Sequence, residues 1–166
     1  MKTYRNLKFV NCMSSHIAFV PARSGSRGFP GKNSKFFDLT AQFISKSKLF
    51  DRTIVSTNDD KVAFKARKYN FEIHKRKKSY AGPNVSIKKT IQNLINEVDL
   101  NKNDIIWLFY IPIIYKNLND FKKAKKAFNN KSINTIMSFF EVEAHPFNFW
   151  KYDNKKNKLK QYVQND

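Results

Sequence analysis

The chain has 166 residues, a hydrophobic fraction of 41% and a formal net charge of +19 from 32 basic and 13 acidic side chains. This length and apolar content suit one globular domain and exclude collagen-like, linker-like and disordered chains. The longest apolar runs fall short of the roughly 20 residues that a membrane-spanning helix needs. One cysteine, Cys12, excludes an intramolecular disulfide, and three scattered histidines give no structural zinc site.

The first sixteen residues carry Lys2, Arg5 and Lys8 but no apolar segment of the length that a secretory signal requires. We interpret residues 1–16 as an N-terminal arm without a catalytic role. A protein without an export signal is expected in the cytoplasm, with no membrane partner.

Short apolar runs rich in β-branched residues predict five strands. They cover residues 17–20, 52–57, 71–73 and 104–110, and a last run from Ser132 or Ile133 to Phe140. The run 104–110 is continuous enough for a central strand that is buried on both faces. Near the end of the sequence, residues 148–152 and 158–163 flank a polar turn and predict a β-hairpin.

Apolar residues at helical spacing predict helices over 36–48, 60–69, 87–98 and 120–128, with Phe121, Ala124 and Phe128 of the last one facing inward. The predicted caps are Asn58, Asp59 and Asp60 before the second helix, Asn70 after it, and Ser86 before the third. Strands and helices alternate along the chain. This order predicts an α/β fold with right-handed crossovers, a mostly parallel sheet and helices on both faces.

The loop after the first strand holds the residues best suited to binding chemistry. Residues 21–33 contain three glycines, two serines and the cations Arg23, Arg27 and Lys32. Parallel sheets bind ligands beyond the carboxyl ends of their strands, and backbone N–H groups, hydroxyls and cations together bind phosphate. A triphosphate suits this loop, although a basic surface loop whose glycines only turn the chain is an alternative. The loop is no Walker A motif, because Asn33 stands where that motif has Ser or Thr.

The net charge of +19 raises the question of a nucleic-acid partner. Of the basic residues, 26 are lysine and six are arginine, and they occur with 19 asparagines and 16 phenylalanines. AT-rich codon usage produces this composition, and base recognition favours arginine over lysine. We therefore interpret the charge as a solvated basic surface and regard nucleic acid as an unlikely partner, with a charge-driven polyanion (RNA) binder as the alternative.

The stretch from Ile17 to Asn33 resembles the N-terminal signature of the acylneuraminate cytidylyltransferases, the CMP-sialic acid synthetase family. That signature reads Pro-Ala-Arg-x-Gly-Ser-Lys/Arg-Gly and leads to Lys-Asn. Residues 49–57 and 141–147 are similar to two later family segments, in the same order. The resemblance implies a Rossmann-like fold of the nucleotide-diphospho-sugar transferase type, with residues 17–166 as a partial cytidylyltransferase domain.

The activity that the resemblance implies is the activation of a nonulosonic, sialic-type acid by CTP. The sugar hydroxyl attacks the α-phosphate, and the products are a CMP-sugar and pyrophosphate, with Mg²⁺ as the expected cofactor. Catalysis of such a displacement depends on positioning and charge neutralisation. A non-catalytic remnant that binds CTP or another anion is the alternative from the class of binding proteins.

The resemblance also implies the site residues. Arg23 and Lys32 match the family's catalytic cations at the phosphates. The implied nucleotide contacts are Ala22, Arg23, Ser24, Gly25, Ser26, Arg27, Lys32, Asn33, Arg76 and Ser86. Arg76 also lies in the basic run 75–78, so a solvated charge without a binding role is an alternative for it.

The sequence departs from the family's pattern in several places. Residues 34–39 replace a Gly-Lys-Pro-Leu turn, and residues 109–115 keep little more than Pro112 of a segment that contacts substrates, so the sugar acid is open. Family members continue into a dimerisation segment and a strand with two metal-binding carboxylates, whereas this sequence stops at Asp166. We expect a C-terminally truncated domain with no protein ligands for Mg²⁺, a homodimer only if that segment is dispensable, and weak or no turnover.

Overall fold

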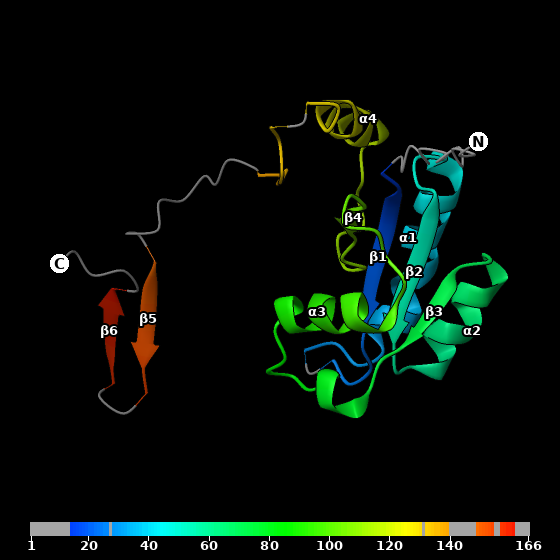
Figure 1. Cartoon of the computed structure of the whole chain (residues 1–166). Coiled ribbons are helices and arrows are strands. Elements are labelled where there is room, and N and C mark those ends of the chain that lie inside the picture. Colours follow the sequence, from blue (N-terminus) through cyan, green and yellow to red (C-terminus); the bar gives the residue numbers. More distant parts are fainter. Residues whose placement is uncertain (1–13, 27, 131, 140–148, 155–156, 162–166) are drawn as a thin grey trace, which may run out of the picture. The chain divides into compact units, whose positions relative to one another are not determined.

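The structure is a computed structural model, in which residues 14–26, 28–130, 132–139, 149–154 and 157–161 are described (Figure 1). The chain divides into two compact units between residues 126 and 127, and each unit is described by itself. The elements in chain order are β1 (His16–Ala22), α1 (Lys32–Ser47), β2 (Arg52–Thr57), α2 (Asp60–Lys68), β3 (Glu72–Lys75), η1 (Lys78–Tyr80), α3 (Ile87–Glu97), β4 (Ile105–Leu108), α4 (Leu118–Ala127), β5 (Trp150–Asp153) and β6 (Lys158–Gln161).

A four-stranded parallel sheet in the order β3-β2-β1-β4 forms the centre of the first unit (Figure 1). In β1, Ile17 pairs with Arg52 of β2 on one side and with Ile106 of β4 on the other. Parallel neighbours need crossover connections, and here the helices supply them. The predicted α/β, Rossmann-like fold class is confirmed.

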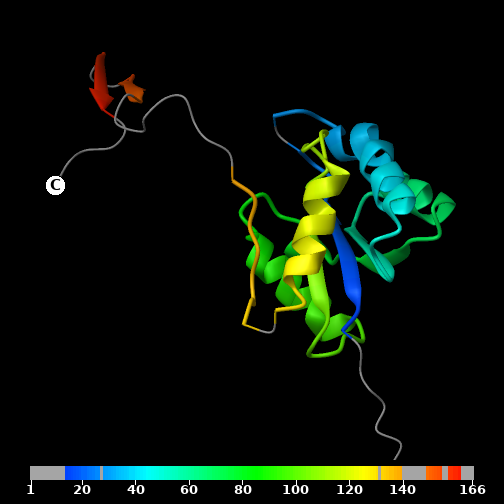
Figure 2. The same cartoon turned by 90° about the horizontal axis from the view of Figure 1, so that it is seen from above.

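Helices cover both faces of this sheet, as the alternating elements predict (Figure 2). Successive side chains of a strand point to opposite faces, so β1 contributes to two cores. Ala18 and Val20 pack in the core that also holds buried residues of α1 and α2. Ile17 and Phe19 pack on the other face with Leu94 of α3. Burial on both faces fixes β1 in the interior of the sheet.

Side chains cap the N-termini of two helices, at the residues predicted from the sequence. Asp59 Oδ1 accepts hydrogen bonds from the backbone N–H groups of Lys61 (3.0 Å) and Val62 (3.4 Å) at the start of α2. Ser86 is the N-cap of α3. After α2 the chain turns at Asn70, which has the left-handed φ of 57° that asparagine tolerates. No helix in the described part of the chain is long and apolar enough to cross a membrane.

Removing the cap of α2 is expected to destabilise the fold modestly. Asp59→Ala leaves two backbone N–H groups without their acceptor, which costs about 0.5–2 kcal/mol of unfolding free energy. Urea unfolding followed by circular dichroism measures this loss. Asp60→Ala, one residue further into the same helix, is the control and should cost less; an equal cost would contradict the capping role.

The prediction that residues 104–110 form a central strand buried on both faces is wrong. β4 covers only Ile105–Leu108, lies at the end of the strand order, and leaves Leu108 37% exposed. Of the apolar residues that follow it, Phe109 still donates its backbone N–H to the Phe19 carbonyl oxygen of β1 at 2.9 Å, and both Phe109 and Ile111 are buried in the core beside α1 and α2. A continuous apolar run indicates that its side chains are buried, and side chains can be buried in a loop as well as in a strand between two others.

The predicted strand that ends at Phe140 is also wrong over its described part. Residues 133–139 form neither helix nor strand, and Met137 and Phe139 are 67% and 83% exposed. A strand exists only where a neighbouring strand takes up its N–H and C=O groups, and none among the described residues pairs with this run. Phe140 itself lies outside the described residues.

The predicted hairpin near the end of the sequence is confirmed. β5 and β6 pair antiparallel, with Trp150 opposite Gln161 and Asp153 opposite Lys158. The last predicted helix is confirmed as α4. Its Phe121 packs against the aromatic residues Phe43, Phe50, Trp107 and Phe109 of the first unit.

Candidate functional site

The glycine-rich loop after β1 lies at the carboxyl edge of the sheet, where the strand order reverses. The chain builds β2 and β3 on one side of β1 and then places β4 on the other side. Loops that leave two strands at such a reversal diverge and open a crevice for a ligand. A cavity of about 290 Å³ lies there, with walls from the residues that follow β1, β3 and β4.

This cavity brings together five of the site residues that the resemblance implied: Arg23, Ser26, Lys32, Asn33 and Arg76. The rest of its lining is Pro21 of β1, Val85, Ile87 and Thr90 around the start of α3, and Tyr110 and Pro112 after β4. Three of the lining residues are cations, and none of the described lining residues is acidic. The cavity is therefore electropositive and suited to an anion.

The Arg23 backbone is fixed by the first turn of α1. Its carbonyl oxygen accepts a hydrogen bond of 2.8 Å from Nδ2 of the buried Asn33. Its guanidinium Nη1 donates to the carbonyl oxygens of Ser24 and Gly25, at 3.2 and 3.0 Å. Gly25 has a φ of 70°, a left-handed conformation that favours glycine. Asn33 thus anchors the loop that carries Arg23.

A second asparagine, Asn58, holds the same loop from the end of β2. Its Oδ1 accepts from the Ser24 backbone N–H at 2.9 Å, and its Nδ2 donates to the Ser24 hydroxyl at 2.8 Å. The Ser24 N–H is therefore engaged within the protein in this conformation. The sequence patterns predicted Asn58 only as a residue that starts a helix. Its position directly after the carboxyl end of β2 was the signal that could have indicated a role at the site.

The N-terminus of α1 faces the loop without a cap of its own. Gly31 is the N-cap, with a φ of 71° and no side chain to accept from the first N–H groups. The first turn contains no acidic residue, and its first residue, Lys32, lines the cavity. The Lys32 N–H donates to the Phe29 carbonyl oxygen at 3.2 Å, and the positive end of the helix dipole favours an anion at such a terminus.

Arg76 is the most deeply buried cation of the cavity, with 6% of its surface exposed. Its Nε donates to the Ser56 hydroxyl and its Nη2 to the Ser56 carbonyl oxygen, both at 3.0 Å. Burial, and secondarily the nearby charge of Arg23, lowers the pKa of Arg76 to about 10, so the group is still charged at neutral pH. No carboxylate among the described residues forms an ion pair with it.

Burial separates Arg76 from the basic run in which it lies. Its neighbours Lys75, Lys77 and Lys78 are exposed to solvent, whereas Arg76 is buried and lines the cavity. The alternative of a merely solvated charge therefore fits the three lysines but not Arg76.

The remaining implied site residues lie elsewhere. Ala22 is buried in the core, and Ser24 and Gly25 do not line the cavity. Ser86 is exposed, and its hydroxyl accepts from the Lys89 N–H at 3.2 Å as the N-cap of α3. Arg27 lies outside the described residues.

The described residues do not fit a magnesium ion. Within them, no group of three or more His, Cys, Asp or Glu side chains is placed to hold a metal. The cavity offers three cations and no carboxylate, whereas Mg²⁺ prefers carboxylate, phosphate and water oxygens. We therefore assign no step of a reaction to a metal held by these residues.

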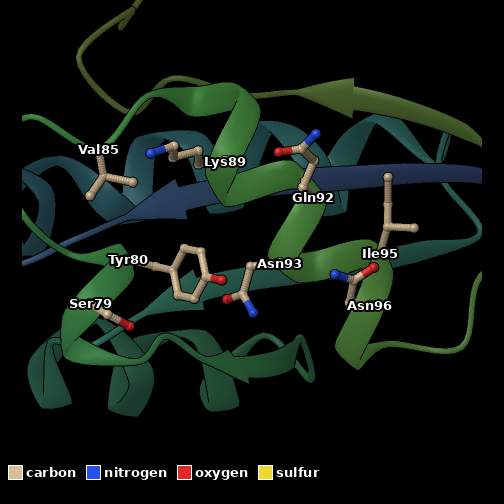
Figure 3. A pocket seen from close by; sticks show the side chains of 8 residues that line it. All are labelled: Ser79, Tyr80, Val85, Lys89, Gln92, Asn93, Ile95 and Asn96. Atoms are coloured by element: carbon tan, nitrogen blue, oxygen red, sulfur yellow. The ribbon is translucent and has the colours of Figure 1, made fainter.

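A larger hollow of about 530 Å³ lies between η1 and α3, and Val85 is the one described residue that it shares with the first cavity (Figure 3). Its lining is Ser79, Tyr80, Val85, Lys89, Gln92, Asn93, Ile95 and Asn96. Lys89 is its one basic lining residue, so it lacks the concentration of charge that marks the first cavity. Asn93 is buried, and its Oδ1 has no hydrogen-bond partner among the described residues.

Glu97, the last residue of α3, accepts three side-chain hydrogen bonds. Donors are Lys77 Nζ at 2.6 Å, the Asn93 amide, and His74 Nε2 at 3.0 Å. Donation by these groups, Lys77 first, lowers the pKa of Glu97 to about 2. The carboxylate is therefore charged over the whole neutral and mildly acidic range.

This lowered pKa predicts a pH-dependent contribution to stability. Because the folded-state pKa of Glu97 is below the ordinary 4.5, its contribution is complete above pH 4.5 and is lost as the pH falls toward about 2. The difference in unfolding free energy between the wild type and Glu97→Gln should shrink over that interval. Urea unfolding at a series of pH values measures it, and a difference that stays constant from pH 7 to pH 2.5 would contradict the assignment.

Comparison with known proteins identifies the family. Residues 17–164 match the sequence model of a protein family described as cytidylyltransferase. The chain belongs to the cytidylyltransferase family. The family expected from the loop signature is thereby confirmed, and the match covers both the cavity-forming unit and the hairpin.

Individual relatives of this cytidylyltransferase-family chain are distant. It is 22% identical over 138 residues to an N-acylneuraminate cytidylyltransferase of Streptococcus agalactiae serotype V. The enzymes of the same name from serotypes III and Ia match to the same extent. Each match covers 78% of this chain and 33% of the relative, so the chain spans about a third of the length of these relatives.

Proposed function

We propose that this chain binds CTP in the 290 Å³ cavity and that the reaction of this site is the transfer of CMP to a nonulosonic, sialic-type acid, with weak or no turnover expected of the isolated chain. In this reaction the hydroxyl oxygen of the sugar acid forms a bond to the α-phosphorus. The bond from that phosphorus to the bridging oxygen breaks, pyrophosphate leaves, and the hydroxyl proton passes to water. Support for the sugar class comes from the name of the relatives, N-acylneuraminate cytidylyltransferase.

The burial of Arg76 beside Arg23, with no carboxylate of the described part of the chain paired to it, is the observation that carries the nucleotide part of the proposal. A buried cation is costly unless an opposite charge accompanies it, and Arg23 adds repulsion. Both side chains line the same cavity. A triphosphate supplies the missing negative charge and relieves both costs at once.

The residues around the cavity have separate roles in this proposal. Arg23 and Lys32 neutralise the charge that develops on the phosphates as pyrophosphate leaves, assisted by the N–H groups that begin α1. Arg76 binds the nucleotide from the carboxyl end of β3, two strands away from β1 at the same edge of the sheet. Asn33 and Asn58 hold the loop in place. Charge neutralisation and positioning are what phosphoryl and nucleotidyl transfer require of a protein.

Two further expectations belong to the same proposal. Mg²⁺, which the family resemblance implies, has no fitting ligands among the described residues, so no residue is assigned to it. A cytoplasmic location accords with CTP as the substrate.

Calorimetric titration of the full chain with CTP and with ATP tests the proposal. We expect one saturable CTP site that is weaker for ATP and only moderately sensitive to salt. A charge-driven polyanion binder instead shows no nucleotide preference and an affinity that falls steeply with salt. That second result would contradict the proposal. Pyrophosphate release in the presence of CTP and a panel of nonulosonic acids then tests the sugar class.

A further inference from the structure

A continuous chain of hydrogen bonds connects Arg76 in the cavity to the end of α3. Arg76 Nε lies 3.0 Å from Ser56 Oγ, Ser56 Oγ lies 2.9 Å from His74 Nδ1, and His74 Nε2 lies 3.0 Å from Glu97 Oε2. Ser56 and His74 are direct partners across the β2–β3 pair. All but Glu97 are buried, and Ser56 is wholly inaccessible.

The positions of the protons in this series of hydrogen bonds follow from the groups at its two ends, Arg76 and Glu97. The Arg76 guanidinium has only donors, so the Ser56 hydroxyl accepts from it. In the neutral tautomer with its proton on Nε2, His74 accepts a hydrogen bond from the Ser56 hydroxyl at Nδ1 and donates from Nε2 to the Glu97 carboxylate. With this tautomer every hydrogen bond points the same way, from the guanidinium to the carboxylate. Such a run is more rigid than its separate bonds because each bond polarises the next.

The order serine, histidine, glutamate is also that of a hydrolytic triad, but the surroundings exclude nucleophilic attack by Ser56. Its hydroxyl is inaccessible to a substrate, and its oxygen is the acceptor for Arg76 Nε at 3.0 Å. A serine nucleophile needs an open approach and a base that withdraws its proton during the attack. This series of hydrogen bonds therefore orients Arg76 and takes no part in an attack on a substrate.

One edge of the Arg76 guanidinium is held and the other is free. Nε and Nη2 both donate to Ser56, whereas Nη1 has no hydrogen-bond partner among the described residues. Two bonds to one residue fix the plane of the guanidinium. Arg76 at the same time lines the cavity that holds Arg23 and Lys32.

The far end of the chain is anchored as firmly. Glu97 is held by Lys77 and by the Asn93 amide in addition to His74. Asn93 is buried and lines the hollow between η1 and α3 (Figure 3). The histidine is thereby placed between two fixed groups, Ser56 on one side and Glu97 on the other.

We propose that Ser56, His74 and Glu97 are positioning residues that orient the Arg76 guanidinium for an anionic group of a bound nucleotide. The inference rests on the proposed function, because it concerns how the same cavity binds CTP. A long arginine side chain otherwise loses its rotamer freedom when the ligand arrives. Orienting it in the free protein removes that cost from the binding step.

A double-mutant cycle with CTP affinity as the readout tests this role. In the full chain, Ser56→Ala should weaken CTP binding roughly 3- to 10-fold, the effect of losing one hydrogen bond. Glu97→Ala, at a partly exposed position, should weaken it by a smaller factor. In the Arg76→Met background neither change should weaken binding further, since no guanidinium is left to orient. Asn96→Ala, an exposed neighbour of Glu97, is the control and should leave the affinity unchanged.

The outcomes separate this inference from the proposed function. Equal losses with and without the arginine would show a general structural effect and overturn the positioning role. Unchanged CTP affinity in both variants would overturn it as well. If Ser56→Ala does not fold, Glu97→Ala in the two backgrounds decides. If the unmodified chain binds no CTP, the proposed function itself is overturned and the role of the three residues in nucleotide binding with it.

Discussion

Arg23→Ala is expected to weaken CTP binding roughly 10- to 100-fold, because a charge-assisted hydrogen bond contributes about 1.5–3 kcal/mol. Arg23 lines the cavity in a loop that Asn33 and Asn58 still hold when the bonds from its Nη1 to the carbonyl oxygens of Ser24 and Gly25 are removed. Loss of the guanidinium should therefore remove a ligand contact and leave the loop in place. Isothermal titration with CTP measures the affinity, and urea unfolding establishes that the variant is folded.

The matched control is Arg67→Ala, an exposed arginine on α2 that does not line the cavity. Both variants reduce the net charge of +19 by one, so a general electrostatic effect of the protein would be equal in the two. We expect less than a twofold change for Arg67→Ala. Equal losses in the two variants would favour a charge-driven polyanion binder over a CTP site.

Arg76→Met is expected to weaken CTP binding strongly but measurably, without destabilising the free protein. Arg76 is a buried cation with no carboxylate partner among the described residues, and burial lowers its pKa to about 10. Replacing such an unpaired charge by an apolar side chain of similar length removes the cost of keeping the charge out of water. The lost bonds to Ser56 offset part of that gain. We therefore expect an unfolding free energy at or slightly above that of the wild type.

The affinity for CTP should fall at least as much as in Arg23→Ala, since Arg76 contributes its charge from a more buried position. Function and stability would then change in opposite directions, as is usual for residues kept for a ligand. Urea unfolding and CTP titration on the same sample measure both. A destabilisation above roughly 1 kcal/mol with unchanged affinity would show that Arg76 serves the fold instead.

Local sequence signals sufficed for the parts of this molecule that depend on neighbouring residues. The loop between β1 and α1, the caps Asp59 and Ser86 and the turn at Asn70 are each specified within a few residues. The buried run of β1 is equally local. The role of the loop residues at a nucleotide stays a prediction, although the structure gathers four of them, Arg23, Ser26, Lys32 and Asn33, around one cavity.

Contacts between distant residues carried no such signal. Asn58 meets Ser24 across 34 positions, and Glu97 meets His74 across 23, so neither pairing could be seen from spacing alone. The same limit explains the error at β4, whose apolar run gave its burial but not the number of its neighbouring strands. The failed strand at 133–139 has the same cause, because pairing depends on a partner elsewhere in the chain.

A crystal of the full chain soaked with CTP tests the central claim most directly. We expect triphosphate density in the cavity at the carboxyl ends of β1 and β3, with phosphate oxygens within hydrogen-bond distance of Arg23, Lys32 and Arg76. A cavity that stays empty at saturating CTP, or nucleotide bound on the lysine-rich surface elsewhere, would contradict it.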